Sequence, residues 1–261
     1  MVAPSLIPGL PQQEDYIADT AALEAFCQTI QGSAWLALDT EFIRQTTYYP
    51  QFCLLQISNG VVAACIDPLA IDQLQPLLDI VYDPNIVKVW HAARQDLEVF
   101  QHRWQRIPSP VFDTQLAAAQ LGYADQIGYA DLVQTVCHIP LPKDQSRTDW
   151  MTRPLTVQQI RYALDDVVYL GALYLHLQAA LTKAQQRQLA IQQAHLLLPE
   201  TYAPTPEEVW RKIKGHKRLN KDQLLILQRL ATWREKQARQ QDVPRQWLLS
   251  DRAMLAQCRA E

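Results

Sequence analysis

The chain has 261 residues, of which 48% are hydrophobic and 20% charged, enough to build one large domain or a medium domain with a small one. The net charge of −3 hides a division, because residues 1–204 carry 11 Lys and Arg against 20 Asp and Glu, whereas residues 205–261 carry 13 against 7. An acidic body with a basic end fits carboxylates that hold cations beside a surface that holds phosphates, although ordinary solvated charge would give the same totals.

Several classes of protein are disfavoured by the pattern of residues. The longest apolar runs, such as residues 61–66, fall far short of the roughly 20 residues that cross a bilayer, so we expect no membrane span. The first twenty residues hold three acids and no Lys or Arg, which is unlike a secretory signal. The five cysteines show no pair at metal-ligand or redox spacing, so we expect reduced thiols in a cytoplasmic protein.

The first predicted elements are strands. Residues 34–43 form an apolar run that ends in acids, and residues 53–58 and 61–67 are two further runs separated by Asn59-Gly60. That dipeptide between two strands is a strong hairpin signal, so these two strands should be antiparallel neighbours. Residues 86–90 predict a fourth strand, which runs into a helix over residues 93–104.

The later elements alternate and then become helical. A short strand at 111–112 precedes helices at about 114–121 and 130–137, and a long helical stretch, with a break left open, begins at Thr156 and continues towards His195. This order indicates the α/β class, a mixed sheet flanked by helices. Three prolines within residues 199–206 predict a domain boundary between a first domain at 1–200 and a second at 205–261. The second reads as helix, turn, helix, the last helix covering about 221–239.

Two carboxylates stand side by side in the first predicted strand. Asp39 and Glu41 are two residues apart, so they point the same way from the sheet. Neighbouring acids beyond an apolar run repel each other and lose solvation unless a cation lies between them. A divalent ion is one solution, and a strand end that simply faces water is the other.

Three more residues extend this pattern. Asp96 opens the helix after the fourth strand and would lie near Glu41 if that strand is parallel to the first, although an acid in a first helical turn also suits the helix dipole. Tyr162 and Asp166 lie four apart on a predicted helix, so they share one face, one turn apart. The apolar residues around them turn this face inward, where a carboxylate needs a partner or a metal.

Taken in order, these motifs resemble the DEDD exonucleases and, among them, the ribonuclease D family. The resemblance covers most of residues 34–175, including Leu38-Asp39-Thr40-Glu41-Phe42, His91 to Phe100, Phe112-Asp113-Thr114-Gln115, Ser146-Arg147-Thr148-Asp149-Trp150 and Tyr162 to Leu170. It implies a ribonuclease H-like fold and metal binding by Asp39, Glu41, Asp96 and Asp166. The residue four before Asp166 is Tyr162, which indicates the tyrosine subclass.

The implied activity is a 3′→5′ exoribonuclease that releases nucleoside 5′-monophosphates from RNA 3′ ends, such as those of transfer RNA precursors. In-line attack on a phosphodiester is served by two divalent ions about 4 Å apart, and oxygen ligands favour Mg²⁺ or Mn²⁺ over zinc. In this hypothesis Asp39 bridges both ions, Glu41 and Asp166 complete the site of the ion that activates water, and Asp96 serves the other. Tyr162 orients the water.

Substrate contacts are the next expectation. The resemblance implies that Phe42 lies against the last base, although ordinary core packing would also explain a phenylalanine there. Arg147 and Arg153 are interpreted as phosphate contacts, with ion pairs to Asp144 or Asp149 as the alternative.

The basic end resembles the start of the helicase-and-ribonuclease-D C-terminal (HRDC) module, a small all-α nucleic-acid binder. It departs in length, because the chain stops at Glu261, before such a module is normally complete. Two other functions stay open: a 3′→5′ exodeoxyribonuclease, since related families cut DNA with the same residues, and a non-catalytic nucleic-acid-binding adaptor. No obligate protein partner is indicated.

Overall fold

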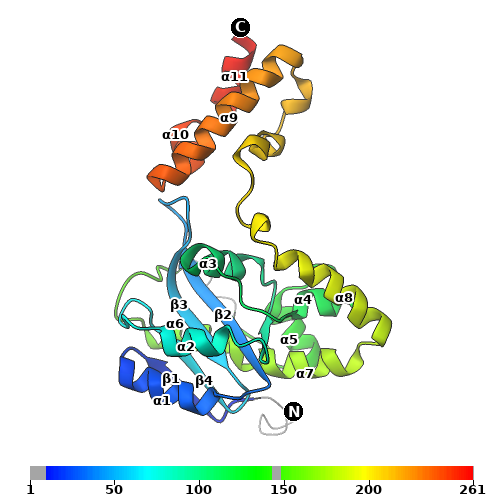
Figure 1. Ribbon diagram of the computed structural model, residues 1–261. Coiled ribbons are helices and arrows are strands. Elements are labelled where there is room, and N and C mark those ends of the chain that lie inside the picture. Colours follow the sequence, from blue (N-terminus) through cyan, green and yellow to red (C-terminus); the bar gives the residue numbers. More distant parts are fainter. Residues whose placement is uncertain (1–9, 143–147, 261) are drawn as a thin grey trace. The chain divides into compact units, whose positions relative to one another are not determined.

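The computed structural model describes residues 10–142 and 148–260 (Figure 1). Its internal contacts divide the chain into two compact units. The larger unit comprises Met1–Ile43 and Phe52–Leu197, and the C-terminal unit comprises Arg44–Gln51 and Leu198–Glu261. The eight residues Arg44–Gln51 therefore belong to the C-terminal unit although both of their sequence neighbours belong to the larger one.

The larger unit is built on a six-stranded sheet with the order β1-β4-β3-β2-β5-β6. β3 and β4 are antiparallel, whereas β1 is parallel to β4, β2 to β5 and β5 to β6. The predicted mixed sheet is therefore confirmed, with β2 in its interior between β3 and β5. The strands are β1 Gln13–Ile17, β2 Trp35–Ile43, β3 Gln51–Ser58, β4 Val62–Ile66, β5 Val87–Trp90 and β6 Val111–Asp113.

The described part of the larger unit contains eight α-helices. None of the described helices of the chain is both long and apolar enough to span a membrane. α6 packs against β2 and β4, α7 packs against β2 and β5, and α3 lies against β2. The helices are α1 Thr20–Ile30, α2 Gln75–Val81, α3 Arg94–Trp104, α4 Thr114–Gln120, α5 Tyr129–Cys137, α6 Val157–Val168, α7 Leu170–Ala180 and α8 Lys183–Leu196.

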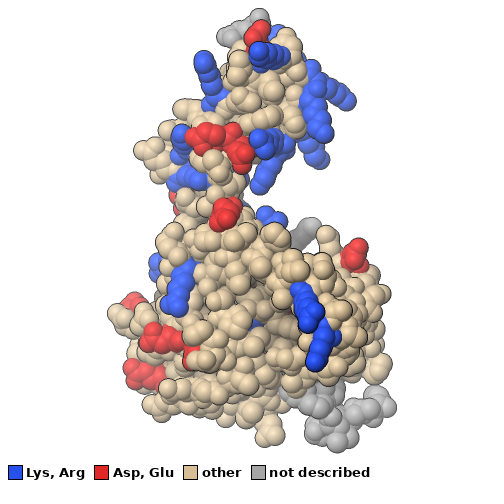
Figure 2. Space-filling model, turned by 45° about the vertical axis from the view of Figure 1, so that its right-hand side comes forward, with Lys and Arg blue, Asp and Glu red and all other residues tan. Residues whose placement is uncertain are grey.

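The C-terminal unit is helical, and Lys and Arg side chains gather on it in Figure 2. The predicted second helix is confirmed as α9 (Lys221–Gln241), and α10 (Arg245–Leu248) and α11 (Asp251–Ala260) follow it. The predicted first helix is wrong in type, because Pro206–Lys212 and His216–Arg218 form short 3-10 segments separated by Gly215, whose φ is +102°. A small core of Val209, Ile213, Leu227, Ala231, Met254 and Cys258 holds these segments together.

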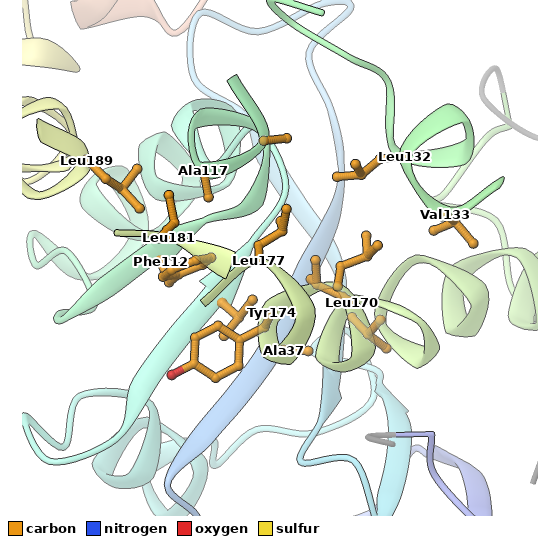
Figure 3. Packing of buried hydrophobic residues seen from close by; sticks show 14 residues of the cluster. Ala37, Phe112, Ala117, Leu132, Val133, Leu170, Tyr174, Leu177, Leu181 and Leu189 are labelled. Carbon is orange, nitrogen blue, oxygen red and sulfur yellow. The ribbon is translucent and has the colours of Figure 1, made fainter. Parts of the chain in front are cut away.

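One core of the larger unit lies between the sheet and α7. In Figure 3, Leu170, Tyr174 and Leu177 of α7 lie over Ala37 of β2 and Phe112 of β6. The rings of Tyr174 and Phe112 meet edge to face with their centroids 4.9 Å apart. This apolar layer holds β2 rigidly, which matters because β2 carries the acids discussed below.

Local capping fixes where the long helical stretch of residues 157–196 begins and where its last helix starts. The Thr156 hydroxyl accepts a hydrogen bond from the Gln159 amide, and the Gln159 side chain accepts one from the Thr156 amide, so α6 starts with a capping box. Thr182 and Gln185 repeat the arrangement at the start of α8. The break that the sequence left open is thus resolved into three helices.

One buried ion pair ties the segment after Trp150 to the edge of the sheet. Arg153 donates to both carboxylate oxygens of Asp67, at 2.6 and 2.9 Å, and its remaining hydrogens reach the carbonyls of Cys53, Trp150 and Thr152. Burial would raise the pKa of Asp67, but hydrogen bonds from Arg153 and Tyr16 outweigh burial and hold that pKa below its usual value. All five guanidinium hydrogens therefore have acceptors within the protein.

We predict that Arg153→Lys lowers the free energy of unfolding by about 2 kcal/mol, because a lysine cannot serve both oxygens of the buried Asp67 and the three carbonyls at once. Urea unfolding measures the change. Arg161→Lys is the matched control: the Arg161 side chain is exposed and pairs with Glu14 and, one helical turn away, with Asp165, so its replacement should cost about 0.5 kcal/mol or less. Equal losses in the two variants would contradict the structural role given to Arg153.

Candidate active site

Three carboxylates converge where α6 crosses β2. Asp39 and Glu41 project from β2, and Asp166 projects from the last turns of α6. One oxygen from each of the three lies within 4.8 Å of the others. The i, i+2 spacing puts the first two on one side of the strand, and packing of α6 on β2 brings the third to them.

Asp96 approaches the same place from α3. Because β5 is parallel to β2, the helix that follows β5 begins at the sheet edge where β2 ends, as the sequence analysis expected. The Asp96 side chain is buried, and its Oδ1 accepts a hydrogen bond of 2.5 Å from the Thr40 hydroxyl. Asp96 is not among the three residues within 4.8 Å of one another, but its charge raises the pKa of Asp39.

Burial raises the pKa of every acid in this cluster, and repulsion from neighbouring acids raises it further at three of them. Burial is the largest cause at each residue; it raises the pKa of Glu41 to about 9, that of Asp166 to about 8 and that of Asp96 to about 7, and it raises the pKa of Asp39 well above its usual value. The charges of neighbouring acids add to the effect at Asp39, Glu41 and Asp166. Such a group of oxygens is stabilised by protons or by a hard divalent cation, and the donor set fits Mg²⁺ or Mn²⁺.

Tyr162 lies beside this cluster. It lines a pocket of about 280 Å³ together with Asp165 and Asp166 of α6 and Tyr129 and Asp131 of α5. Burial, followed by the charges of nearby acids that include Asp166, raises the pKa of the Tyr162 hydroxyl. The phenol therefore keeps its proton at neutral pH and can donate a hydrogen bond into the pocket.

Tyr129 is a neighbour of the site that the sequence analysis missed. Its hydroxyl donates a 2.8 Å hydrogen bond to the backbone carbonyl of Asp165, which is next to Asp166. No spacing rule links two residues 36 positions apart on different helices, so the sequence carries no signal for this contact. His91 lies edge-on to Tyr129, and its ring nitrogens lie 2.9 Å from the Thr114 hydroxyl and 3.0 Å from the Ile127 carbonyl, as expected of an interior histidine rather than a metal ligand.

The structure describes two of the three residues that were expected to contact the substrate. Phe42 is half-buried at the end of β2, which leaves both of its interpretations open. The guanidinium hydrogens of Arg153 are all taken by Asp67 and backbone carbonyls, which leaves none for the expected phosphate contact. Among the described residues its carboxylate partner is Asp67 and not the suggested Asp149, and Asp144 lies outside the described residues. Arg147 lies outside the described residues.

Comparison with known proteins agrees with this geometry. A family model described as 3′-5′ exonuclease matches residues 15–182, and an HRDC domain model matches residues 223–259. The chain is 43% identical over 239 residues to a ribonuclease D of Pseudomonas paraeruginosa, covering 92% of this chain and 64% of that protein. The chain thus spans less than two thirds of the length of that curated relative.

Solved structures show the same fold. The structure of Escherichia coli RNase D, described as an exoribonuclease involved in structured RNA processing, is similar with a TM-score of 0.82 and 36% identity, over 94% of this chain and 66% of that one. Brucella melitensis NrnC with bound Mg²⁺ has a TM-score of 0.60 and 25% identity, over 73% of this chain and 92% of that one. The predicted ribonuclease H-like fold and resemblance are confirmed: the chain belongs to the 3′-5′ exonuclease family, and within it resembles ribonuclease D.

Proposed function

We propose that this chain is a divalent-metal-dependent 3′→5′ exoribonuclease that releases nucleoside 5′-monophosphates. The observation that carries the proposal is the convergence of Asp39, Glu41 and Asp166 within 4.8 Å, with Asp96 close enough to raise the pKa of Asp39. Two similar proteins support it, one described as an exoribonuclease and the other solved with bound Mg²⁺.

In this proposal the acids bind the metal ions and Tyr162 orients the attacking water. Asp39, Glu41 and Asp166 would hold one ion, and Asp39 and Asp96 would hold a second. When bound, two such ions supply the positive charge that lowers the pKa of an attacking water and stabilises the departing 3′ oxygen. The Tyr162 phenol, which keeps its proton, orients the water by a hydrogen bond. Thr40 fixes the direction of the Asp96 carboxylate.

We further propose that the substrate is a structured RNA such as a transfer RNA precursor, whose 3′ end enters the site with Phe42 against the last base and Arg147 near a phosphate. A basic groove of about 500 Å³ in the C-terminal unit supports an RNA substrate. Its lining includes Lys212, Lys214, Arg252 and Arg259, and its one acid, Asp251, pairs with Arg234 at 2.8 Å. Four cations around one groove attract a phosphate backbone more than they attract any neutral ligand.

The four acids also bear on the two alternative functions, a non-catalytic adaptor and an exodeoxyribonuclease. A non-catalytic adaptor has no use for four buried acids that repel one another, because their repulsion lowers stability without adding affinity for phosphates. A 3′→5′ exodeoxyribonuclease would use the same acids, so the choice between RNA and DNA depends on a direct comparison of substrates. We also place the protein in the cytoplasm, a proposal supported by five cysteines of which none forms a disulfide.

The proposal predicts a specific pattern of products from end-labelled RNA. A 3′ label should leave at once as a mononucleotide, whereas a 5′ label should pass through a ladder of shortening fragments. Chelator should stop the reaction, and Mg²⁺ or Mn²⁺ should restore it. Internal fragments, or cleavage that survives chelator, would contradict it. A matched DNA oligomer cut faster than the RNA would favour the deoxyribonuclease, and binding without cleavage would favour the adaptor.

Two substitutions separate metal binding from water orientation. Asp39→Asn should lower kcat on the order of 10³-fold, because it removes a ligand shared by both ions. Tyr162→Phe should lower kcat on the order of 10²-fold and leave Mn²⁺ affinity, measured by calorimetry, within about twofold of the wild type. Glu98→Gln is the matched control, since Glu98 lies two positions from Asp96 on α3 and points elsewhere. An unchanged rate in Tyr162→Phe would remove the role given to the phenol.

Because the pKa values of Glu41 and Asp166 are raised, we predict that protons and metal ions compete for the same carboxylates. In the folded protein the pKa values of Glu41 and Asp166, about 9 and 8, lie above those of an unfolded chain, so their contribution to stability is present at acid pH and is lost as pH rises through 8–9. Metal binding must displace these protons, so Mn²⁺ affinity should increase from pH 6.5 to 8.5 and binding should release protons. Calorimetry in two buffers of different ionisation enthalpy measures the release.

The matched control for this pH effect is Glu41→Gln. Without the Glu41 carboxyl, the metal-free protein should lose less thermal stability between pH 6.5 and 8.5 than the wild type does. Binding of Mn²⁺ by the wild type with no proton release at pH 7 would show that the acids are already ionised and that the cluster differs from the one described here.

A further inference from the structure

Asp113, the last residue of β6, ties the start of α3 to the rest of the larger unit. It is buried, with 3% of its surface exposed. Its Oδ2 accepts a hydrogen bond of 2.9 Å from the amide of Ala93, the cap residue of α3, and its Oδ1 accepts one of 3.2 Å from the amide of Ala92. Two successive amides before the helix are therefore bound by one carboxylate that comes from a different strand.

The turn that Asp113 holds has a backbone that needs support. Ala92 adopts a φ of +56°, in the left-handed region that favours glycine, and a residue with a side chain keeps such a conformation where its surroundings fix it. The Thr114 hydroxyl donates a 3.1 Å hydrogen bond to the Trp90 carbonyl and lies 2.9 Å from Nδ1 of His91. Asp113 and Thr114 thus contact each of the four residues that lead from β5 into α3.

The position of Asp96 in α3 shows why the Ala93 amide matters. With Ala93 as the cap, Asp96 is the third helical residue. In a capping box, the side chain at this position reaches back and accepts a hydrogen bond from the amide of the cap residue. Here Asp113 accepts that hydrogen bond, and Asp96 accepts one of 2.5 Å from the Thr40 hydroxyl. The Asp96 carboxylate therefore stays beside the acids of β2, where its charge adds to burial in raising the pKa of Asp39.

We propose that Asp113 is a positioning residue for Asp96. By accepting the amide that a carboxylate at the third helical position would otherwise take, it keeps Asp96 turned towards the cation site. All of these contacts lie within the larger unit. The inference rests on the proposed function, in which Asp96 serves the second ion.

One substitution separates this role from the capping of α4. Oδ1 of Asp113 also accepts hydrogen bonds from the amides of Gln115 at 2.9 Å and Leu116 at 3.2 Å, so it caps α4. In Asp113→Asn, the side-chain oxygen in the place of Oδ1 keeps three hydrogen bonds, and the side-chain nitrogen that faces Ala93 is a donor and cannot accept. Because asparagine is a good helix cap, α4 should keep its start while the Ala93 amide loses its acceptor.

We expect Asp113→Asn to weaken, by about tenfold, the same Mn²⁺ binding event that Asp96→Asn weakens, because Asp96 can then turn back to the Ala93 amide. Calorimetry on the full chain measures this binding. With a four-nucleotide RNA, the Mn²⁺ concentration for half-maximal rate should rise about tenfold, while kcat at saturating Mn²⁺ stays within about threefold of the wild type. In the metal-free variant, amide hydrogens at the start of α3 should exchange faster, and those of α1 should not.

Leu23→Ala separates positioning from a general loss of stability. Leu23 is fully buried in α1, which packs against α2, so a cavity there should lower Tm at least as much as Asp113→Asn does while Mn²⁺ affinity stays within about twofold of the wild type.

Three results would overturn the inference: a wild-type Mn²⁺ isotherm in Asp113→Asn, unchanged exchange at the start of α3, or an equal loss of Mn²⁺ affinity in Leu23→Ala. A wild-type protein that binds Mn²⁺ but cuts no RNA would instead refute the proposed function, and calorimetry would still decide the role of Asp113.

Discussion

The repulsion among four acids, of which Asp96 is buried and the other three are partly buried, is the constraint on which the rest of this structure depends. Asp39, Glu41, Asp96 and Asp166 come from three elements, and burial raises the pKa of each. A fold that brings like charges together must obtain stability elsewhere and must keep the elements from moving apart. The apolar layer of α7 over β2 and the capping box of α6 meet both needs. The arrangement that places the carboxylate ligands rigidly therefore also lowers the stability of the protein at this site.

The two faces of β2 carry different polar residues. Asp39 and Glu41 point towards α6, while Thr40, on the opposite face, orients Asp96 of α3. A single strand in the interior of the sheet therefore carries two acids of the cluster and is hydrogen-bonded to a third.

Local sequence geometry predicted which acids would share a face, but it did not predict the partner of Arg153. Asp39 with Glu41, and Tyr162 with Asp166, are related by the repeat of one strand and one helix, so their shared faces follow from local geometry. Arg153 has no such relation to Asp67, which is 86 positions away, and a cation in a polar stretch resembled a phosphate ligand. The amphipathic spacing of α1, with Leu23, Phe26, Cys27 and Ile30 buried and Asp19 as its cap, was present in the sequence and could have been found. β1 buries Ile17 alone, so it shows no alternation to detect.

The sequence by itself determined the strands of the hairpin, the helix that carries Tyr162 and Asp166, and the residue types that make an oxygen-only cation site, because each depends on neighbours within a few positions. The tertiary structure decided which distant groups meet. It paired Arg153 with Asp67, set the Tyr129 hydroxyl beside Asp165, and assigned Arg44–Gln51 to the C-terminal unit through Tyr48 and Glu235, 187 positions apart. The reason is physical: a buried charge must find its partner within about 3 Å, and which partner lies at that distance is settled by the packing of whole elements and not by any local repeat.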